Sequence, residues 1–141
     1  KLNTPGIALS AMTQVHAMTD VTGFGLAGHL LEICRGSSLS ADVNFENVPV
    51  IPLAAEIAQS GTATGASARN WDGYGSSMVL PEGFEKWKQN LLSDPQTSGG
   101  LLIACAPEAA QGVLELLRAE DFGAAAVIGS LSVGPAQVQL R

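Results

Sequence analysis

The order of apolar and polar positions along the chain predicts a succession of helices and strands. Apolar residues after Gly25 recur at the spacing of one helix face, and this helix should end near Gly36 because glycine favours helix ends. Residues 39–46 alternate strictly between apolar and polar, which predicts a strand with one buried face, at a sheet edge or among antiparallel neighbours. The continuous apolar run of residues 101–105 predicts a central strand.

Further helices are predicted where a proline stands at the start of an apolar-periodic segment, because proline suits the first turn of a helix. These prolines are Pro5, Pro52 and Pro107, and the second of the helices should end at Gly61. A shorter helix is predicted at 84–92. The positions expected on the buried faces are Ile7, Ala8, Ala11, Met12 and Val15; Leu53, Ala54, Ile57 and Ala58; and Ala109, Val113, Leu116 and Leu117.

The whole pattern predicts a single domain, 1–141, of the α/β (α+β) class with a mixed sheet. Residues 124–131 form another candidate strand, which with the strand at 101–105 and the helix between them suggests a βαβ-like unit. The turn Gly134-Pro135 then leads into a weak terminal strand at 137–140.

Composition indicates a folded domain and argues against two classes of partner. The 141 residues are 46% apolar and only 14% charged, so the chain is able to bury a core. The net charge of −6 argues against nucleic acid and anionic membranes as partners, and no apolar run reaches the roughly 18 residues of a membrane span. Cys34 and Cys105 lie among apolar residues and suit inert core thiols of a cytoplasmic protein.

The stretch 18–28 is the first candidate site, because a carboxylate and two hydroxyls come directly before three glycines. The first N–H groups of the following helix have no partner within the helix, and with the helix dipole they favour an anion. Asp20 beside them offers a ligand for a divalent cation that bridges to phosphate oxygens. The candidate metal–phosphate site comprises Asp20, Thr22, Gly23 and Gly25.

Two other interpretations of this stretch stay open. The spacing Gly23-x-Gly25-x-x-Gly28 matches a dinucleotide-binding fingerprint, although the preceding residues are too polar for a buried parallel strand and Asp42 comes too early for the ribose-binding acid. Alternatively, the glycines serve close packing only, and Asp20 caps the helix. His29 is more typical of a packed or capping residue than of a metal ligand.

Two further segments, at 64–70 and 94–100, are rich in glycine and small polar residues and would suit a phosphate or nucleotide. The first lies in a weakly periodic stretch from Gly61 to Gly83, which predicts a long loop that is functional or mobile. Arg69 within it either forms a forked contact with phosphate or faces solvent.

The sequence offers binding groups without a complete catalytic set. Neither His/Cys nor His/Ser spacing suggests a triad or a zinc site, so no catalytic residue is assigned. Trp71, Tyr74 and Trp87 are expected to serve packing or an interface instead of base stacking, because their surroundings are not basic.

Three motifs resemble the C-terminal half of selenophosphate synthetase, the selenide, water dikinase family. They read Thr19-Asp20-Val21-Thr22-Gly23-Phe24-Gly25-Leu26-x-Gly28-His29, Ser67-Ala68-Arg69-Asn70 and Leu92-x-Asp94-Pro95-Gln96-Thr97-Ser98-Gly99-Gly100-Leu101-Leu102. The motifs occur in the family's order and span most of the chain. Related aminoimidazole-ribotide synthetase-like enzymes, such as the hydrogenase-maturation and thiamin-phosphate kinase members, share the architecture, but the third motif favours the selenium enzyme.

The resemblance implies a layered α/β fold and a part in making selenophosphate, AMP and phosphate from ATP, selenide and water. In that family an N-terminal domain carries the reactive Cys or selenocysteine, a lysine and most metal-binding aspartates. It also builds the homodimer, and ATP lies near the domain junction. Asp20 matches the metal ligand of the C-terminal half, here for Mg²⁺. The motif positions that match residues near substrate are Arg69, Thr97, Ser98 and Gly99.

The resemblance also bears on what this chain does by itself. Because it starts at Lys1 without Met and matches only a C-terminal half, we expect a piece of a larger enzyme that is inactive alone. Two alternatives are a binding or interaction domain without catalysis, and a domain of a related ATP-dependent enzyme. The low charge predicts self-association of the isolated chain.

Overall fold

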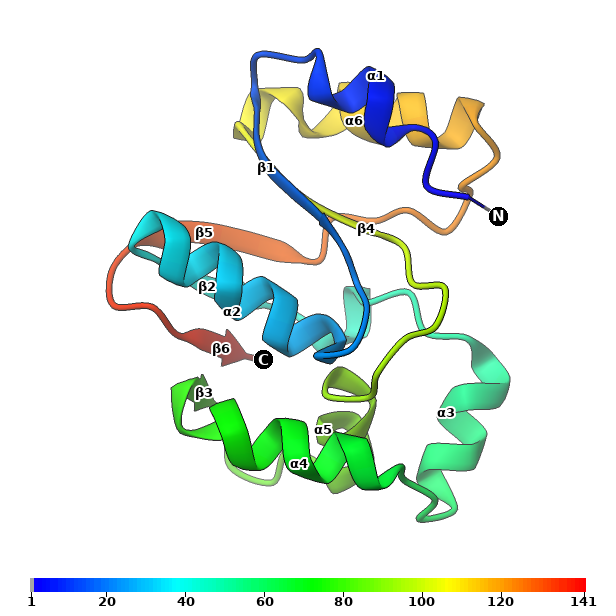
Figure 1. The fold of residues 1–141 in the computed structure, drawn as a ribbon, viewed down its shortest axis with the longest axis vertical. Helices are drawn as coiled ribbons and strands as arrows, with labels where there is room; N and C mark the ends of the chain where they lie inside the picture. The colour runs from blue at the N-terminus through cyan, green and yellow to red at the C-terminus, as the bar shows by residue number, and fades with distance from the viewer. Residues whose placement is uncertain (1) are drawn as a thin grey trace.

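The computed structural model describes residues 2–141 as an α/β fold with its helices arranged around two sheets (Figure 1). The helices are α1 (Gly6–Ser10), α2 (Gly25–Ser37), α3 (Pro52–Gln59), α4 (Gly65–Tyr74), α5 (Lys86–Leu92) and α6 (Ala110–Ala119). The strands are β1 (Val15–Asp20), β2 (Leu39–Val43), β3 (Met78–Val79), β4 (Leu101–Cys105), β5 (Gly129–Val133) and β6 (Val138–Leu140). The short 3-10 turns are η1 (Phe45–Asn47), η2 (Gly75–Ser77) and η3 (Pro107–Ala109).

The larger sheet has the strand order β3-β6-β2-β5 and confirms the expected mixed sheet. β2 pairs antiparallel with β5 and parallel with β6, so of the two alternatives predicted for 39–46, the antiparallel neighbour is confirmed and the edge position is not adopted. The predicted alternation holds, because Ala41 and Val43 are buried opposite Val138 and Leu140 of β6. Alternation reports that one face is buried, and it carries no information on the number of neighbouring strands.

α2 packs against β2 and β6 and contributes the centre of the main core (Figure 1). The helix begins at Gly25 as predicted and buries Leu30, Leu31 and Cys34. It continues to Ser37, and Ser38 adopts the left-handed conformation, with a φ of 54°. The predicted stop at Gly36 is therefore close, but the residue that ends the helix is a serine.

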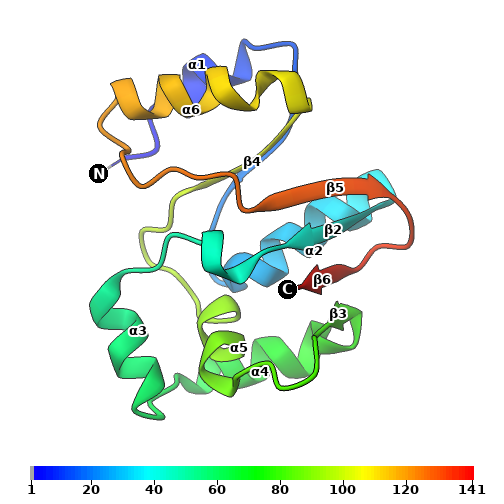
Figure 2. The same cartoon turned by 180° about the vertical axis from the view of Figure 1, so that it is seen from behind.

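The smaller sheet is an antiparallel ribbon of β1 and β4, covered by α1 and α6 at one end of the molecule (Figures 1 and 2). Leu9, Val113 and Leu117 are buried there and form a second core, which confirms the predicted face of α6. The strand at 101–105 is not central, since β1 is its one partner among the described residues. β4 and β5 belong to different sheets, so the predicted βαβ-like unit is also wrong.

The first helix is shorter than the apolar spacing predicts. α1 ends at Ser10, and the chain enters β1 at Val15, a position that the spacing assigns to the helix. Leu9 is fully buried, whereas Ile7 is 79% exposed. A helix of little more than one turn offers only a narrow face for packing, so the apolar spacing overestimates what it buries.

α3 begins at Pro52 as predicted and is followed by Gly61, which has a φ of +90°. Ala58 is buried, but Leu53 and Ile57, both expected inside, are exposed. The reason is the position of α3, which packs mainly against α5 at the margin of the fold (Figure 2).

The predicted loop between Gly61 and Gly83 contains α4, η2 and β3. Thr64 caps α4 by accepting a hydrogen bond from the backbone N–H of Ser67 at 3.1 Å. α4 carries few apolar residues, so hydrophobic periodicity does not reveal it. Trp71 and Tyr74 pack in the main core, and hydrogen bonds to neighbouring segments also hold the helix. The candidate strand at 124–131 starts later, at Gly129, and the weak terminal strand is confirmed as β6.

No helix among residues 2–141 combines the length and the apolar character needed to cross a bilayer.

Candidate functional site

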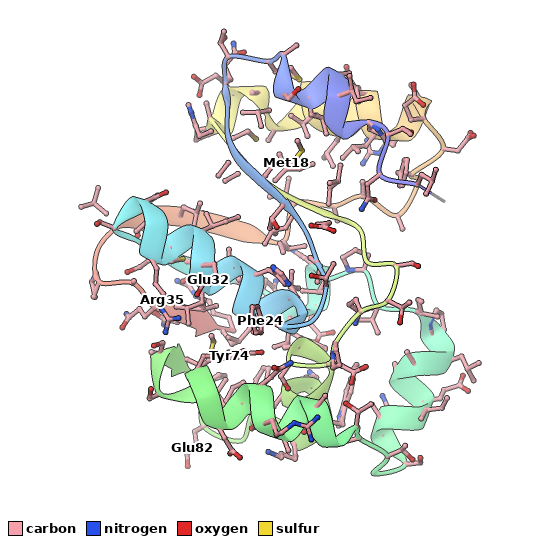
Figure 3. The ribbon with its side chains drawn as sticks, viewed as in Figure 1. Met18, Phe24, Glu32, Arg35, Tyr74 and Glu82 are labelled. Carbon is pink, nitrogen blue, oxygen red and sulfur yellow. The ribbon has the colours of Figure 1, made fainter. Side chains whose placement is uncertain are left out.

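The three sequence motifs converge where α2, α4 and α5 meet (Figure 3). We call this region the motif junction and define it as residues 20–25, 64–70 and 93–100. The side-chain amide of Asn70 donates to the carbonyl oxygen of Gly23 at 2.8 Å and to that of Ser93 at 2.9 Å. One turn further along α4, the hydroxyl of Tyr74 donates to the carbonyl oxygen of Phe24 at 2.6 Å. α4 therefore ties the loop before α2 to the turn after α5.

Asp94 fastens the start of α4 to the third motif. Its Oδ1 accepts hydrogen bonds from the hydroxyl of Thr64 at 2.8 Å and from that of Ser67 at 2.9 Å. Hydrogen bonds to a carboxylate are stronger than those between neutral groups. Ser67 is 2% exposed, so this contact lies inside the fold. Asp94 thus acts as an internal acceptor, and Asp20 is left as the motif carboxylate that faces solvent.

Glycines allow the backbones of the first and third motifs to touch. Gly25 has a φ of +69°, and a Cβ there would lie 2.7 Å from the carbonyl oxygen of Leu92. A Cβ on Gly99 would overlap the carbonyl oxygen of Val21. The N–H of Val21 donates to the carbonyl of Gly100 at 3.0 Å, and the N–H of Gln96 donates to that of Thr22 at the same distance. The packing role of the glycines, one of the open interpretations, is therefore present.

His29 holds the loop before α2 from the other side. Its Nε2 accepts the backbone N–H of Thr22 at 3.0 Å and lies 3.1 Å from the hydroxyl of the same residue. This nitrogen is an acceptor only when it carries no proton, so the contact requires the neutral ring with its proton on Nδ1. The N–H of Gly25 donates to the carbonyl of Thr22 at 3.1 Å. Two backbone donors next to the start of α2 are thus already used within the protein.

The start of α2 differs from the sequence interpretation in which Asp20 caps the helix. Phe24 is the N-cap residue, and no side chain provides a capping hydrogen bond. Asp20 lies four residues earlier, at the end of β1, where it pairs with Leu101 of β4. Its carboxylate is exposed, and no ion pair within residues 2–141 includes it.

The other predicted site residues lie on or beside the motif junction. Thr22, Gly23 and Gly25 form its first loop, and Gly99 abuts that loop from the third motif. Thr97 and Ser98 are exposed in the turn just before Gly99. Arg69 is exposed on α4, directly before Asn70, so it belongs to a helix and not to the predicted loop. Its terminal nitrogen lies near Gly65, 3.4 Å from the position of a Cβ there.

The described residues contain no group of three His, Cys, Asp or Glu side chains that could enclose a metal ion. Asp20 therefore fits Mg²⁺ only as a single carboxylate ligand, with the remaining oxygens supplied by water, a phosphate or another polypeptide segment. Such a shared site suits Mg²⁺, which is usually held by one or two carboxylates together with substrate phosphates and water.

Burial suppresses the reactivity of the phenol and the thiols near the cores. It raises the pKa of Tyr74 to about 12 and raises the pKa of both thiols, Cys34 and Cys105, above their usual value. The neutral Tyr74 hydroxyl remains a donor to Phe24, and the two free cysteines are disfavoured as nucleophiles. Trp71 and Trp87 pack against the main core, in accord with a packing role.

A cleft of about 210 Å³ opens between α3 and the start of α4, next to the motif junction. Its walls are the apolar residues Ala54, Ile57, Ala58, Ala63 and Leu91 together with Thr62, Thr64, Ser67, Asn90 and Asp94. The polar groups of Thr64, Ser67 and Asp94 bond to one another there. The cleft therefore presents mainly apolar surface.

Residues 4–139 match the family model of the AIR synthase related protein, C-terminal domain. The chain belongs to this family. It is 53% identical over 134 residues to a protein named selenide, water dikinase of Dechloromonas aromatica, covering 95% of this chain and 38% of that protein. The proteins of the same name from Paraburkholderia xenovorans and Rhizobium meliloti are 51% and 46% identical to this chain. Each of these two matches covers 99% of this chain and 40% of the relative. The chain thus spans about two fifths of the length of these relatives.

Solved structures of the hydrogenase maturation protein HypE share the AIR synthase-related fold. One, in complex with ATP, has a TM-score of 0.64 and 21% identity over 99% of this chain and 36% of HypE. A second HypE structure has a TM-score of 0.62 and 22% identity, covering 98% and 37% of the two chains. At this identity the similarity concerns the fold, and it confirms the predicted AIR synthase-like architecture.

The residues that join the motifs of this family domain were not among the predicted site residues. Asn70 and Asp94 appear in the motifs, but their side chains point to partners 23 to 47 residues away in sequence. Tyr74 lies outside the motifs and reaches Phe24 across 50 residues. A short polar residue next to a glycine-rich turn is a signal for such contacts, but the partner comes only from the fold.

Proposed function

We propose that this chain is the C-terminal domain of a selenide, water dikinase, which makes selenophosphate, AMP and phosphate from selenide, ATP and water. The observation that carries the proposal is the identity of about half of all residues, along nearly the whole chain, with relatives of that name. The junction of the three motifs supports it, because the segments that carry the resemblance are joined there by hydrogen bonds.

Within this proposal Asp20 is a ligand of Mg²⁺ that bridges to the phosphates of ATP. Support comes from its exposed carboxylate at the end of β1, beside Thr22 and across the ribbon from Leu101. The metal would neutralise phosphate charge during phosphoryl transfer. Arg69, Thr97 and Ser98 are exposed residues of the motif junction and offer a guanidinium and two hydroxyls to phosphate oxygens.

The remaining groups come from the part of the protein that this chain does not include. We propose an N-terminal domain as the partner that holds most of the metal ligands and the reactive Cys or selenocysteine, and that forms the homodimer. The greater length of the relatives supports this division, because the chain covers 38% and 40% of two of them. The isolated chain is accordingly expected to be inactive, and the proposed location is the cytoplasm.

The test measures ATP cleavage by the full-length protein with and without selenide. The proposal expects AMP and phosphate to form only when selenide is present. In Asp20→Asn the half-saturating Mg²⁺ concentration should rise about tenfold or more, because one charged ligand is lost. The exposed Asp72→Asn on α4 is the matched control and should leave it unchanged.

Three outcomes would contradict parts of the proposal. ATP cleavage that does not depend on selenide would indicate a related ATP-dependent enzyme of the same superfamily. Equal Mg²⁺ dependence of Asp20→Asn and the unmodified protein would remove Asp20 from the metal site. Selenophosphate formation by the isolated chain would contradict the proposed division between the two domains.

A further inference from the structure

Asn70 occupies a unique place in the motif junction, because it is the residue of the second motif that contacts both other motif regions. Its amide nitrogen lies 2.8 Å from the carbonyl oxygen of Gly23 and 2.9 Å from that of Ser93. Both partners are acceptors, so the NH₂ group must face them, and each of its two hydrogens has one partner. No other described side chain joins the loop of the first motif to the turn that opens the third.

Backbone hydrogen bonds from Val21 to Gly100 and from Gln96 to Thr22 already join the two segments, and Asn70 adds a side-chain bridge at Gly23 and Ser93. Gly23 is exposed, and a side chain there would meet no neighbour within 4 Å. The Ser93 hydroxyl bonds only within its own turn, to the carbonyls of Gln89 and Asn90. An exposed glycine such as Gly23 has a large conformational freedom, which must be restricted before its loop binds a ligand in one arrangement. Ser93, in contrast, is only 1% exposed and offers a fixed anchor. The Asn70 amide therefore ties the exposed Gly23 to the buried turn at Ser93.

We propose that Asn70 is a positioning residue that fixes the distance between the Asp20–Gly25 loop and the 93–100 turn, so that both present their groups to one ligand. The ligand class is a phosphate-bearing molecule with its divalent cation, and this part rests on the proposed function. Asn70 itself does not contact the ligand, since both of its donors are used within the protein. It acts through Asp20 and Thr22 on one side and Thr97 and Ser98 on the other.

The hydrogen-bonding pattern explains why an amide is needed at this position. An aspartate has the same shape but would turn an oxygen towards two carbonyl oxygens, which is repulsive. Alanine removes the donors without adding repulsion. Asn70→Asp should therefore disturb the motif junction more than Asn70→Ala. Asn47→Asp is the matched control. It makes the same chemical change at an exposed residue of η1, outside the three segments of the motif junction.

The first experiment measures amide hydrogen exchange in the full-length protein, segment by segment. In both Asn70 variants, exchange in 20–25 and in 93–100 should rise together by about tenfold, as expected for the loss of one or two hydrogen bonds. Exchange in β2 and α6 should stay as in the unmodified protein, and Asn47→Asp should change neither segment. Faster exchange throughout the domain, or in neither segment, would overturn the proposal.

The second experiment separates positioning from mere stability through the kinetics of ATP cleavage. The half-saturating concentration of ATP, measured with excess Mg²⁺, should rise about tenfold in Asn70→Asp and less in Asn70→Ala. The rate at saturation should change by less than about threefold, because the reacting groups are still present. A loss of rate at saturation with unchanged half-saturation would overturn the proposal. If the unmodified protein lacks selenide-dependent cleavage, the proposed function fails, and hydrogen exchange still decides the role of Asn70.

Discussion

The two ends of the molecule are held together by different forces. At the motif junction, side chains reach across 23 to 50 residues of sequence to bond backbone carbonyls and one carboxylate. At the end built from α1, α6 and the β1–β4 ribbon, the side-chain hydrogen bonds of residues 6–10 and 110–119 join residues at most four apart. Apolar packing around Leu9, Val113 and Leu117 holds that end instead.

The difference indicates which end depends on precise loop geometry and which on apolar packing. Hydrogen bonds depend on direction as well as distance, so they fix loops in one arrangement. Apolar contacts are non-directional and stabilise an assembly that tolerates small shifts. We therefore expect changes at the motif junction to disturb loop geometry more than stability, and changes in the second core to do the opposite.

The largest effect is expected for Gly99→Ala, where the motif junction has no room for a methyl group. A Cβ would overlap the carbonyl oxygen of Val21, so the backbone must move. The free energy of unfolding should fall by about 4 kcal/mol, measured by urea denaturation. Gly100→Ala is the control, since a Cβ there meets nothing within 4 Å, and it should cost less than about 1 kcal/mol. Equal losses in the two variants would refute the close contact.

Leu9→Ala should come next, with a loss of about 3 kcal/mol in the free energy of unfolding, because it empties a fully buried site in the second core. Hydrogen exchange at 20–25 and 93–100 should remain unchanged below the unfolding transition. Ile7→Ala, on the same helix but 79% exposed, should cost less than about 0.5 kcal/mol. Faster exchange at the motif junction in Leu9→Ala would contradict the separation of the two ends.

Ser67→Ala should have a smaller effect on stability and a larger one on the loops. It removes the buried hydroxyl that donates to the Asp94 carboxylate. Of the two hydroxyls that donate to this carboxylate, only that of Thr64 then remains. We expect a loss of about 1.5 kcal/mol and faster exchange in 93–100. The exposed Ser76→Ala serves as the control. Unchanged exchange in 93–100 would mean that Asp94 does not fasten the third motif.

Tyr74→Phe should have the smallest effect at neutral pH, about 1 kcal/mol, because one hydrogen bond to Phe24 is lost. The folded state raises the pKa of Tyr74 from 10.0 to about 12, so it favours the protonated phenol. The associated stability is complete below pH 10.0 and is lost as the pH rises towards about 12. Tyr74→Phe should lack this decline.

The measurement for Tyr74 is direct, because the chain contains one tyrosine. Tyrosinate absorbance of the folded chain should develop at a pH well above 10.0, the usual pKa of tyrosine. The free energy of unfolding of the unmodified chain and of Tyr74→Phe should be compared across the same pH range. Ionisation near pH 10.0 in the folded chain would show that Tyr74 is not buried against α2.

Local patterns were sufficient for much of the fold. The face of α6, the alternation of β2 and the start of α2 were predicted correctly because each depends on a period set by the backbone. The motif residues Asp20, Thr22, Arg69 and Gly99 were identified from residue type, although their function stays a prediction. The errors concern partners: the prediction of a central position for β4 and that of a loop in place of α4 are wrong.

The sequence by itself determined the periodic elements, the glycines that permit close contact, and three motifs with a family resemblance. Only the tertiary structure decided that Asn70 and Tyr74 bond the loop before α2, that Asp94 is an internal acceptor, and that Asp20 remains exposed. The physical reason is that helix and strand periods arise within a few residues. A hydrogen bond between side chain and backbone across 50 residues depends on how every element between them packs.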